Sequence, residues 1–218
     1  FDSARNVFIA DQDPTQVLEE RPLPAGGYSP GTIFSGLGNV ESVAVDGSGN
    51  VYIGSLALGL VKETLMTGTF TGYSQSILDS SVYPSGIAVD ASGNLYFTQN
   101  GNQLFKKTLS AGSYSQSIID SGLGRALGVA VDGMGNVYVA DIGYNQIVKE
   151  AFSGGAYTRA VLASGLNGVL GVTINGTGNV VGSSARANDV WSINFATPQG
   201  LSFATTNVGA TSIPQTVT

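Results

Sequence analysis

The chain has 218 residues, of which 42% are hydrophobic and 11% are charged, so one packed domain is expected. Its net charge of −6, without a basic stripe, argues against nucleic acid as a partner, and the absence of an apolar run of about 18 residues argues against a membrane span. Because the sequence has no Cys and no His, thiolate and imidazole catalysis, disulfides and Cys- or His-ligated metals are excluded.

One short motif recurs along the chain. It reads SVAVDGSGNVYIGS from Ser42, GIAVDASGNLYFTQ from Gly86 and GVAVDGMGNVYVAD from Gly128, with a decayed copy, GVTINGTGNVVGSS, from Gly171 and a partial copy, FDSARNVFIAD, at the start. The equivalent residues, separated by 44, 44, 42 and 43 positions, are Asp2, Asp46, Asp90, Asp132 and Asn175. This period predicts an all-β protein, a β-propeller with five repeat units of four strands each.

In the fourth unit, the pattern predicts strand a at Gly128 to Asp132, strand b at Asn136 to Asp141, strand c at Gln146 to Phe152 and strand d at Tyr157 to Ala163. Strand a is almost wholly apolar in each unit, which is typical of a strand buried on both faces. We therefore expect the following residues to be buried between blades: Val43, Val45, Ile87, Val89, Val129, Val131 and Tyr138.

The turn between strands a and b carries an Asp, a Gly and an Asn in the better copies. Gly135 can adopt the positive φ that such a turn needs, and the Asp132 carboxylate can accept amide hydrogens from the turn. A calcium loop would need alternating carboxylates and a terminal bidentate Glu, which are absent here. The turns are therefore predicted to be structural.

The two ends of the chain depart from the repeat. Pro22 and Pro24 predict an irregular region between strands c and d of the first unit, because proline is unsuited to a strand ladder. The fifth unit shows no recognisable strand d, so we assign residues 1–196 to the propeller and 197–218 to a tail. The alternating segment Leu201 to Thr205 is expected to pair as a strand, with this propeller or with a neighbouring chain. The propeller is then five-bladed or an incomplete six-bladed ring.

The repeated motif resembles the NHL-repeat family of β-propellers, of the type found in long secreted bacterial repeat proteins, and the likeness covers Phe1 to Ala196. The tail resembles the truncated start of an Ig-like domain. Lyases of the NHL family use His, which is absent, and the gluconolactonase-like hydrolases hold a metal with carboxylate and Asn ligands, for which no matching Glu is evident. Its RNA-binding members need a basic face. The resemblance therefore implies an extracellular or cell-surface binding propeller.

Candidate ligand-binding residues lie in the loops that join strand b to strand c and one unit to the next, because these loops vary between units and share one face of a propeller. They are Asp11, Asp13, Tyr83, Gln99, Asn100, Arg125, Asp141, Tyr144, Arg186 and Asp189. The alternative is that they are solvated loop residues without a ligand. A cation at Asp11, Asp141 or Asp189 is a further alternative on oxygen-ligand preference alone.

These observations predict a non-catalytic extracellular scaffold that recognises a protein, peptide or glycan and needs no cofactor and no metal. Two alternatives remain open. One is a structural subunit that self-associates through unpaired terminal strands, and the other is a hydrolase or lyase that uses a metal at the channel mouth.

Overall fold

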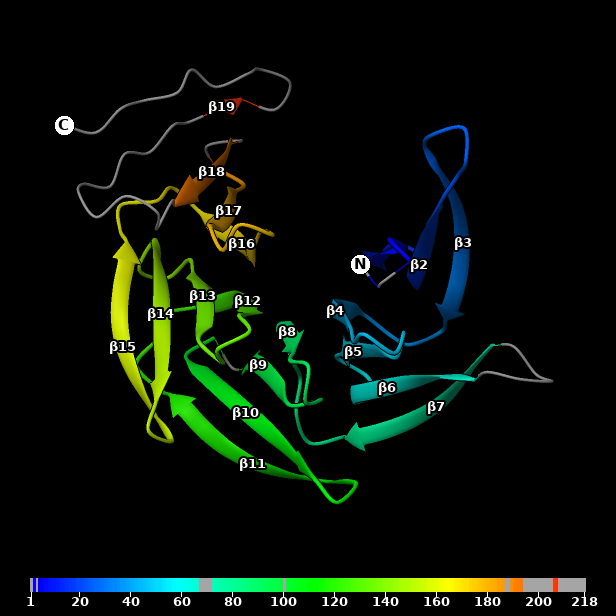
Figure 1. Ribbon diagram of the computed structural model, residues 1–218, viewed down its shortest axis with the longest axis horizontal. Helices are drawn as coiled ribbons and strands as arrows, with labels where there is room; N and C mark the ends of the chain where they lie inside the picture. The colour runs from blue at the N-terminus through cyan, green and yellow to red at the C-terminus, as the bar shows by residue number, and fades with distance from the viewer. Residues whose placement is uncertain are drawn as a thin grey trace. The chain divides into compact units, whose positions relative to one another are not determined.

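The computed structural model describes Asp2 and residues 4–66, 72–99, 101–186, 189–193 and 206–207. Regular structure in these residues consists of β-strands alone, arranged in five sheets in which consecutive strands pair (Figure 1). None of these residues forms a helix that could cross a membrane. The predicted all-β propeller fold with five blades is confirmed.

The blades follow one another along the chain, and we name the strand positions a to d from the first strand of a complete blade. The strands of the first three blades are β1 (Val7–Gln12), β2 (Thr15–Pro22) and β3 (Tyr28–Ser35); β4 (Val40–Val45), β5 (Val51–Ser55), β6 (Gly59–Met66) and β7 (Gly72–Asp79); and β8 (Gly86–Val89), β9 (Leu95–Gln99), β10 (Gln103–Ser110) and β11 (Ser113–Asp120). The last two blades hold β12 (Ala126–Val131), β13 (Val137–Asp141), β14 (Gln146–Ser153) and β15 (Ala156–Ala163); and β16 (Val169–Ile174), β17 (Val180–Ser184), β18 (Asp189–Ile193) and β19 (Thr206–Asn207).

The first blade has three described strands, which pair in the order β1-β2-β3 and occupy positions b, c and d. The expected irregularity around its prolines is wrong, because β2 and β3 pair without a break from Leu18 and Thr32 out to Pro22 and Tyr28. The one register shift, between Val17 and Leu18, has counterparts in the second and fourth blades. The ladder accommodates its prolines because Pro22 is the last residue of β2 and Pro30 lies in the edge strand β3, where a missing N–H need not break a pair.

The fifth blade does have a strand at position d, contrary to the expectation from its sequence. This strand, β19, consists of Thr206 and Asn207, which pair with Val190 and Asp189 of β18. Leu201 to Thr205, the segment predicted to pair, lies outside the described residues, as does the predicted boundary between residues 196 and 197. Self-association through terminal strands stays a prediction.

Strand b forms the most deeply buried part of each of the three middle blades. Every residue of β5, β9 and β13 is buried. Burial of Ile87, Val129 and Tyr138 is confirmed. The prediction is wrong for four residues of strand a, which are only half-buried: Val43, Val45, Val89 and Val131. Strand a has a paired strand on one side alone, whereas strand b is flanked on both sides. The burial of strand a therefore depends on what packs against each residue, so that Ile87 is buried and Val89 of the same strand is not.

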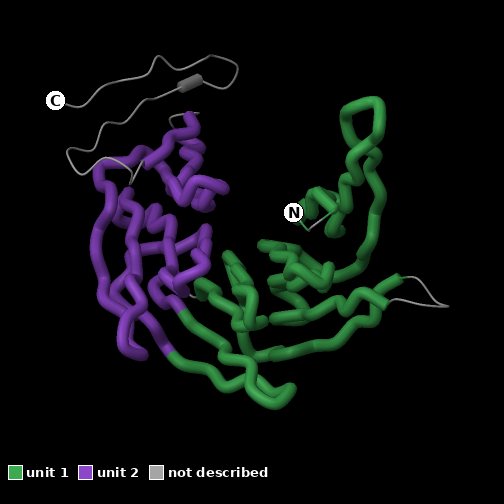
Figure 2. The backbone as a smooth tube through the Cα atoms, viewed as in Figure 1, with its two compact units in different colours: residues 1–100, 105–117 green, residues 101–104, 118–218 purple. Residues whose placement is uncertain are grey.

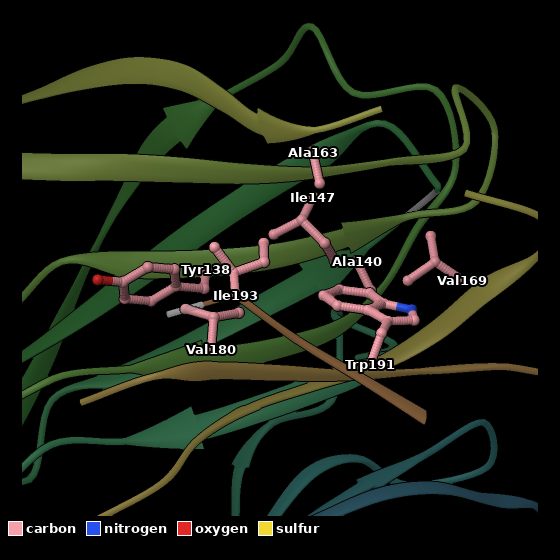
Figure 3. Close-up of a cluster of buried hydrophobic side chains, with 8 residues drawn as sticks. All are labelled: Tyr138, Ala140, Ile147, Ala163, Val169, Val180, Trp191 and Ile193. Carbon is pink, nitrogen blue, oxygen red and sulfur yellow. The ribbon is translucent and has the colours of Figure 1, made fainter. Parts of the chain in front are cut away.

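The chain divides into two compact units, residues 1–100 with 105–117 and residues 101–104 with 118–218 (Figure 2). The first unit holds two apolar clusters, one around Val51 and Ile53 and the other around Leu95 and Phe97. The cluster of the second unit joins its two blades, with Tyr138, Ala140 and Ile147 from one and Trp191 and Ile193 from the other (Figure 3). This packing fixes the strand ends from which the loops of the second unit emerge.

Candidate functional site

In the turns between strands a and b, the polar side chains form hydrogen bonds within the same turn or with the strand that follows it. Asp132 Oδ1 accepts the amides of Met134 and Asn136, both at 2.9 Å, while Oδ2 accepts Asn136 Nδ2 at 2.7 Å and the Tyr138 hydroxyl at 3.1 Å. Burial raises the pKa of Asp132, but these hydrogen bonds outweigh it and the pKa lies below its usual value. Gly135 has a φ of 83°, as the turn was predicted to need. The turn-capping interpretation is confirmed.

The same network recurs at Asp46 with Tyr52 and at Asp90 with Tyr96. A lysine of strand c lies over each of these tyrosine rings, with its Nζ 5.3 to 5.4 Å from the ring centroid; the pairs are Lys62 on Tyr52, Lys106 on Tyr96 and Lys149 on Tyr138. The fifth blade has Asn175 and Val181 in place of the Asp and the Tyr. The first blade keeps the Asp, Asp2, but has Phe8 at the Tyr position, and Asp2 still accepts the amides of Ala4 and Asn6. The carboxylate therefore caps its turn with or without the tyrosine.

Two further ionisable clusters are buried beside strand c. In the first unit, Lys107 Nζ lies 2.6 Å from Asp79 Oδ2. Burial raises the pKa of Asp79, but hydrogen bonds from Lys107 and Ser81 outweigh it and bring the pKa to about 2. The pair therefore holds a charged lysine against a charged carboxylate.

In the second unit, Glu150 is buried close to Asp120, and Arg159 Nη1 lies 3.1 Å from Asp120 Oδ2. Burial, followed by the neighbouring Asp120 carboxyl, raises the pKa of Glu150 to about 7. Both clusters belong to the scaffold, and sequence analysis did not single out either of them.

At the end of strand b that is farther from the a–b turn, the last residue of the strand anchors the loop that follows. Asp141 is fully buried; its Oδ1 accepts the amide of Arg125 at 2.8 Å, and its Oδ2 accepts the amide of Gly124 at 3.0 Å and Gln146 Nε2 at 3.0 Å. Burial raises the pKa of Asp141, but these hydrogen bonds outweigh it and lower the pKa. The carboxylate thus ties the loop before β12 to the loop after β13.

In other blades, the residues at the position of Asp141 also hold their loops through polar contacts. Ser55 Oγ lies 2.9 Å from Gly38 O and accepts the amides of Ala57 and Leu58, and Ser184 Oγ contacts Asn167 O. Sequence analysis did not select either serine. Their positions, equivalent to Asp141 in the repeat, were the signal that could have identified this place as a loop anchor rather than a ligand contact.

Three of the predicted residues are exposed and lie along one run of contacts in the second unit: Arg125, Tyr144 and Arg186. The Tyr144 ring packs against Gly124, the neighbour of Arg125, so that a Cβ on Gly124 would lie 3.0 Å from Tyr144 Cδ2. Next to Tyr144, Asn145 Oδ1 accepts the amide of Gly168 at 3.1 Å. A Cβ on Gly168 would in turn lie 2.7 Å from Arg186 Cγ. We call these three residues the Arg-Tyr-Arg surface.

The remaining predicted residues do not join this surface. Asp11, Asp13, Tyr83 and Gln99 belong to the first unit, and Asn100 lies outside the described residues. Asp11 accepts Gln16 Nε2 and the Asp13 amide, so it anchors its own loop. Gln99 and Asp189 are buried, and each has one side-chain oxygen without a hydrogen-bond partner among the described residues. Tyr83 is 43% exposed.

The partners of the basic residues distinguish this surface from the scaffold. Of nine Lys and Arg residues, three form ion pairs (Arg21, Lys107 and Arg159) and three lie over tyrosine rings. Within the described residues, no carboxylate lies at ion-pair distance from Arg5, Arg125 or Arg186. Two of these three arginines belong to the Arg-Tyr-Arg surface.

The described residues contain no group of three His, Cys, Asp or Glu placed to hold a metal ion. The predicted cation alternative therefore finds no ligand cluster in that part of the chain. Asp141 in particular already accepts hydrogen bonds on both carboxylate oxygens.

Comparison with solved structures identifies many chains of similar fold, among them the following two. A chain from a nidogen–laminin complex matches with a TM-score of 0.72 and 23% identity, covering 89% of this chain and 73% of that one. A gluconolactonase from Xanthomonas campestris matches with a TM-score of 0.68 and 15% identity, covering 88% and 69%. No protein-family model and no curated protein sequence matches the chain. At these identities the likeness shows the fold, the β-propeller, and the NHL-repeat assignment stays a prediction.

These neighbours correct one prediction, that the chain is not an enzyme. That prediction is wrong in its reasoning, because a propeller of similar fold is a gluconolactonase. The absence of His and Cys removes imidazole and thiolate chemistry, but it does not remove catalysis from the range of functions that this fold supports.

Proposed function

We propose that the chain is a protein-binding β-propeller of the NHL-repeat type, and that the Arg-Tyr-Arg surface of its second unit is the recognition site. The observation that carries this proposal is the contrast in partners described above. Lys107 and Arg159 of the scaffold form ion pairs, while Arg125 and Arg186 are exposed without one in the described residues, on loops that meet the loop of Tyr144, whose side chain is 60% exposed.

The residue types support binding. Tyr and Arg are the residues that most often dominate binding energy at protein interfaces, because each combines a large contact area with directional hydrogen bonds. The loops that carry them are held by the buried Asp141 and the half-buried Asn145, so little conformational entropy would be lost when a partner binds. The occurrence of a similar fold in a nidogen–laminin complex is consistent with this use of a propeller.

The test is selection of peptides from a random phage-displayed library on the immobilised chain, followed by fluorescence anisotropy with the best binder. We expect Tyr144→Ala to weaken binding by about tenfold or more, as for an interface hot spot. Met134→Ala is the matched control, because Met134 is 74% exposed in the a–b turn of the same blade. Equal losses from both variants, or none from either, would overturn the proposed site.

Lactone hydrolysis is a second candidate, and the gluconolactonase among the similar folds is the observation that favours it. The purified chain would be assayed with a set of lactones in the presence of added divalent cations and again with a chelator. Turnover that the chelator abolishes would support this candidate.

We also place the chain outside the cell, on a bacterial surface or secreted, because the repeats resemble those of long secreted bacterial proteins. Detection of the native protein in the cytosolic fraction alone would contradict this placement.

A further inference from the structure

We infer that the partner of the Arg-Tyr-Arg surface is an acidic peptide segment, one that carries two carboxylates with an apolar or aromatic side chain between them. This inference rests on the proposed function and adds the chemistry of the partner. It follows from which charges reach solvent on the surface, from the order of its residues, and from the charge of the rest of the chain.

The charge that this surface offers to a partner is positive. Its arginines are exposed, whereas the two carboxylates of the same loops are buried: Asp141 is fully buried and hydrogen-bonded on both oxygens, and Asp189 is 8% exposed. A guanidinium group is always charged and binds a carboxylate through two parallel hydrogen bonds. A partner that supplies carboxylates would thus provide what Lys107 and Arg159 already find within the protein.

The order of the three residues sets the order of groups in the partner. Tyr144 contacts the Arg125 loop on one side through Gly124, and the next residue, Asn145, bonds Gly168, which packs on Arg186. Along this run of contacts, Tyr144 therefore lies between the loop of Arg125 and the loop of Arg186. An extended peptide that meets both arginines would place an intervening side chain over the Tyr144 ring.

The negative net charge of the chain directs an acidic partner to the exposed arginines. At −6 overall, the protein repels an acidic partner from most of its surface, so attraction is confined to places where positive charge is exposed. Two of the three arginines without an ion pair in the described residues lie on this surface. A basic partner would have the opposite preference, with no reason to contact the arginines. An acidic segment therefore gains both attraction and orientation at the Arg-Tyr-Arg surface.

The test uses the peptides selected on the intact chain, together with poly-L-glutamate and poly-L-lysine as fixed probes. We expect the selected peptides to be enriched in Asp and Glu, and poly-L-glutamate to bind more tightly than poly-L-lysine. Arg125→Gln and Arg186→Gln should each weaken binding about tenfold, and binding should weaken at high salt. Arg5→Gln is the matched control. Arg5 is likewise exposed and without an ion-pair partner in the described residues, but it lies in the a–b turn of the first blade, away from these loops in the repeat.

The other outcomes separate this inference from the proposed function. Peptides that depend on Tyr144 but carry no excess of Asp and Glu would overturn the acidic partner and leave protein binding intact. Failure to select any peptide, with no binding of poly-L-glutamate, would overturn both. Binding of a uronic-acid oligosaccharide such as hyaluronan fragments, with no peptide bound, would assign the surface to an acidic glycan and overturn the peptide inference.

Discussion

The a–b turns and the loops of the second compact unit differ in whether their polar side chains have partners within the protein. At the turn, Asp132 accepts four hydrogen bonds from its own segment, and a lysine covers the tyrosine that donates one of them. In the loops, Arg125, Tyr144 and Arg186 are exposed, and the two arginines have no ion-pair partner within the described residues. The difference teaches that repetition marks self-sufficient structure in this chain, while variation leaves groups available to a partner.

Asp141 is an exception to this contrast. It lies at a loop, but it accepts hydrogen bonds on both carboxylate oxygens, as Asp132 does in the turn. Asp141→Ala should lower the free energy of unfolding by about 3 kcal/mol, since it leaves the Gly124 and Arg125 amides and the Gln146 amide group without an acceptor. Urea denaturation would measure the loss. Asp141→Asn, which keeps one acceptor oxygen, should lose less; a loss below about 1 kcal/mol for the alanine variant would mean that the loops do not depend on this anchor.

The turn of the fourth blade provides the next largest effect. Asp132→Ala should cost about 2 kcal/mol, because the Asn136 side chain and the Tyr138 hydroxyl lose their acceptor in a partly buried place. Asn175→Ala at the equivalent turn of the fifth blade should cost about 1 kcal/mol, since that turn has no tyrosine to satisfy. Thermal or urea unfolding of the two variants in parallel measures the difference, and equal losses would show that the Asp–Tyr bond adds nothing.

Glu150 tests whether the scaffold leaves a polar group unsatisfied. Its pKa is raised from 4.5 to about 7, so folding favours the protonated carboxyl. The stability that it contributes is fully present below about pH 4.5 and is lost as the pH rises through about 7. Glu150→Gln should therefore raise the melting temperature at about pH 8 and change it little at about pH 5. Asp79, whose pKa is lowered to about 2, loses its contribution only as the pH falls below 3.8, so it does not interfere in this window. A Glu150→Gln effect that is the same at both pH values would contradict the raised pKa.

The smallest effect is expected at the Arg-Tyr-Arg surface. Arg125→Gln and Arg186→Gln should each change the free energy of unfolding by no more than about 0.5 kcal/mol, because neither guanidinium group has an ion-pair partner among the described residues. Urea denaturation gives the value. Lys107→Gln is the contrasting variant, since Lys107 is buried against Asp79 and its loss should be clearly destabilising. A large loss at either arginine would place it in the scaffold instead.

The sequence by itself determined the architecture. The repeat period predicted five blades, and in the fourth blade each strand begins and ends within two residues of its predicted bounds. The a–b turns were equally predictable, because their bonds join residues two to six positions apart. Interactions over such short separations require particular residue types at fixed spacings, and here this short motif is repeated in successive blades.

What only the tertiary structure decided is which loop residues are buried. Asp141 and Arg125 were equivalent candidates in the sequence, but their bond spans 16 residues and joins two strand ends that only the folded blade brings together. Ser55 took the same anchoring place with different chemistry, so no residue type marked it. The burial of strand a likewise depends on what packs against it in the folded blades, since Val129 is buried and Val131 of the same apolar strand is only half-buried.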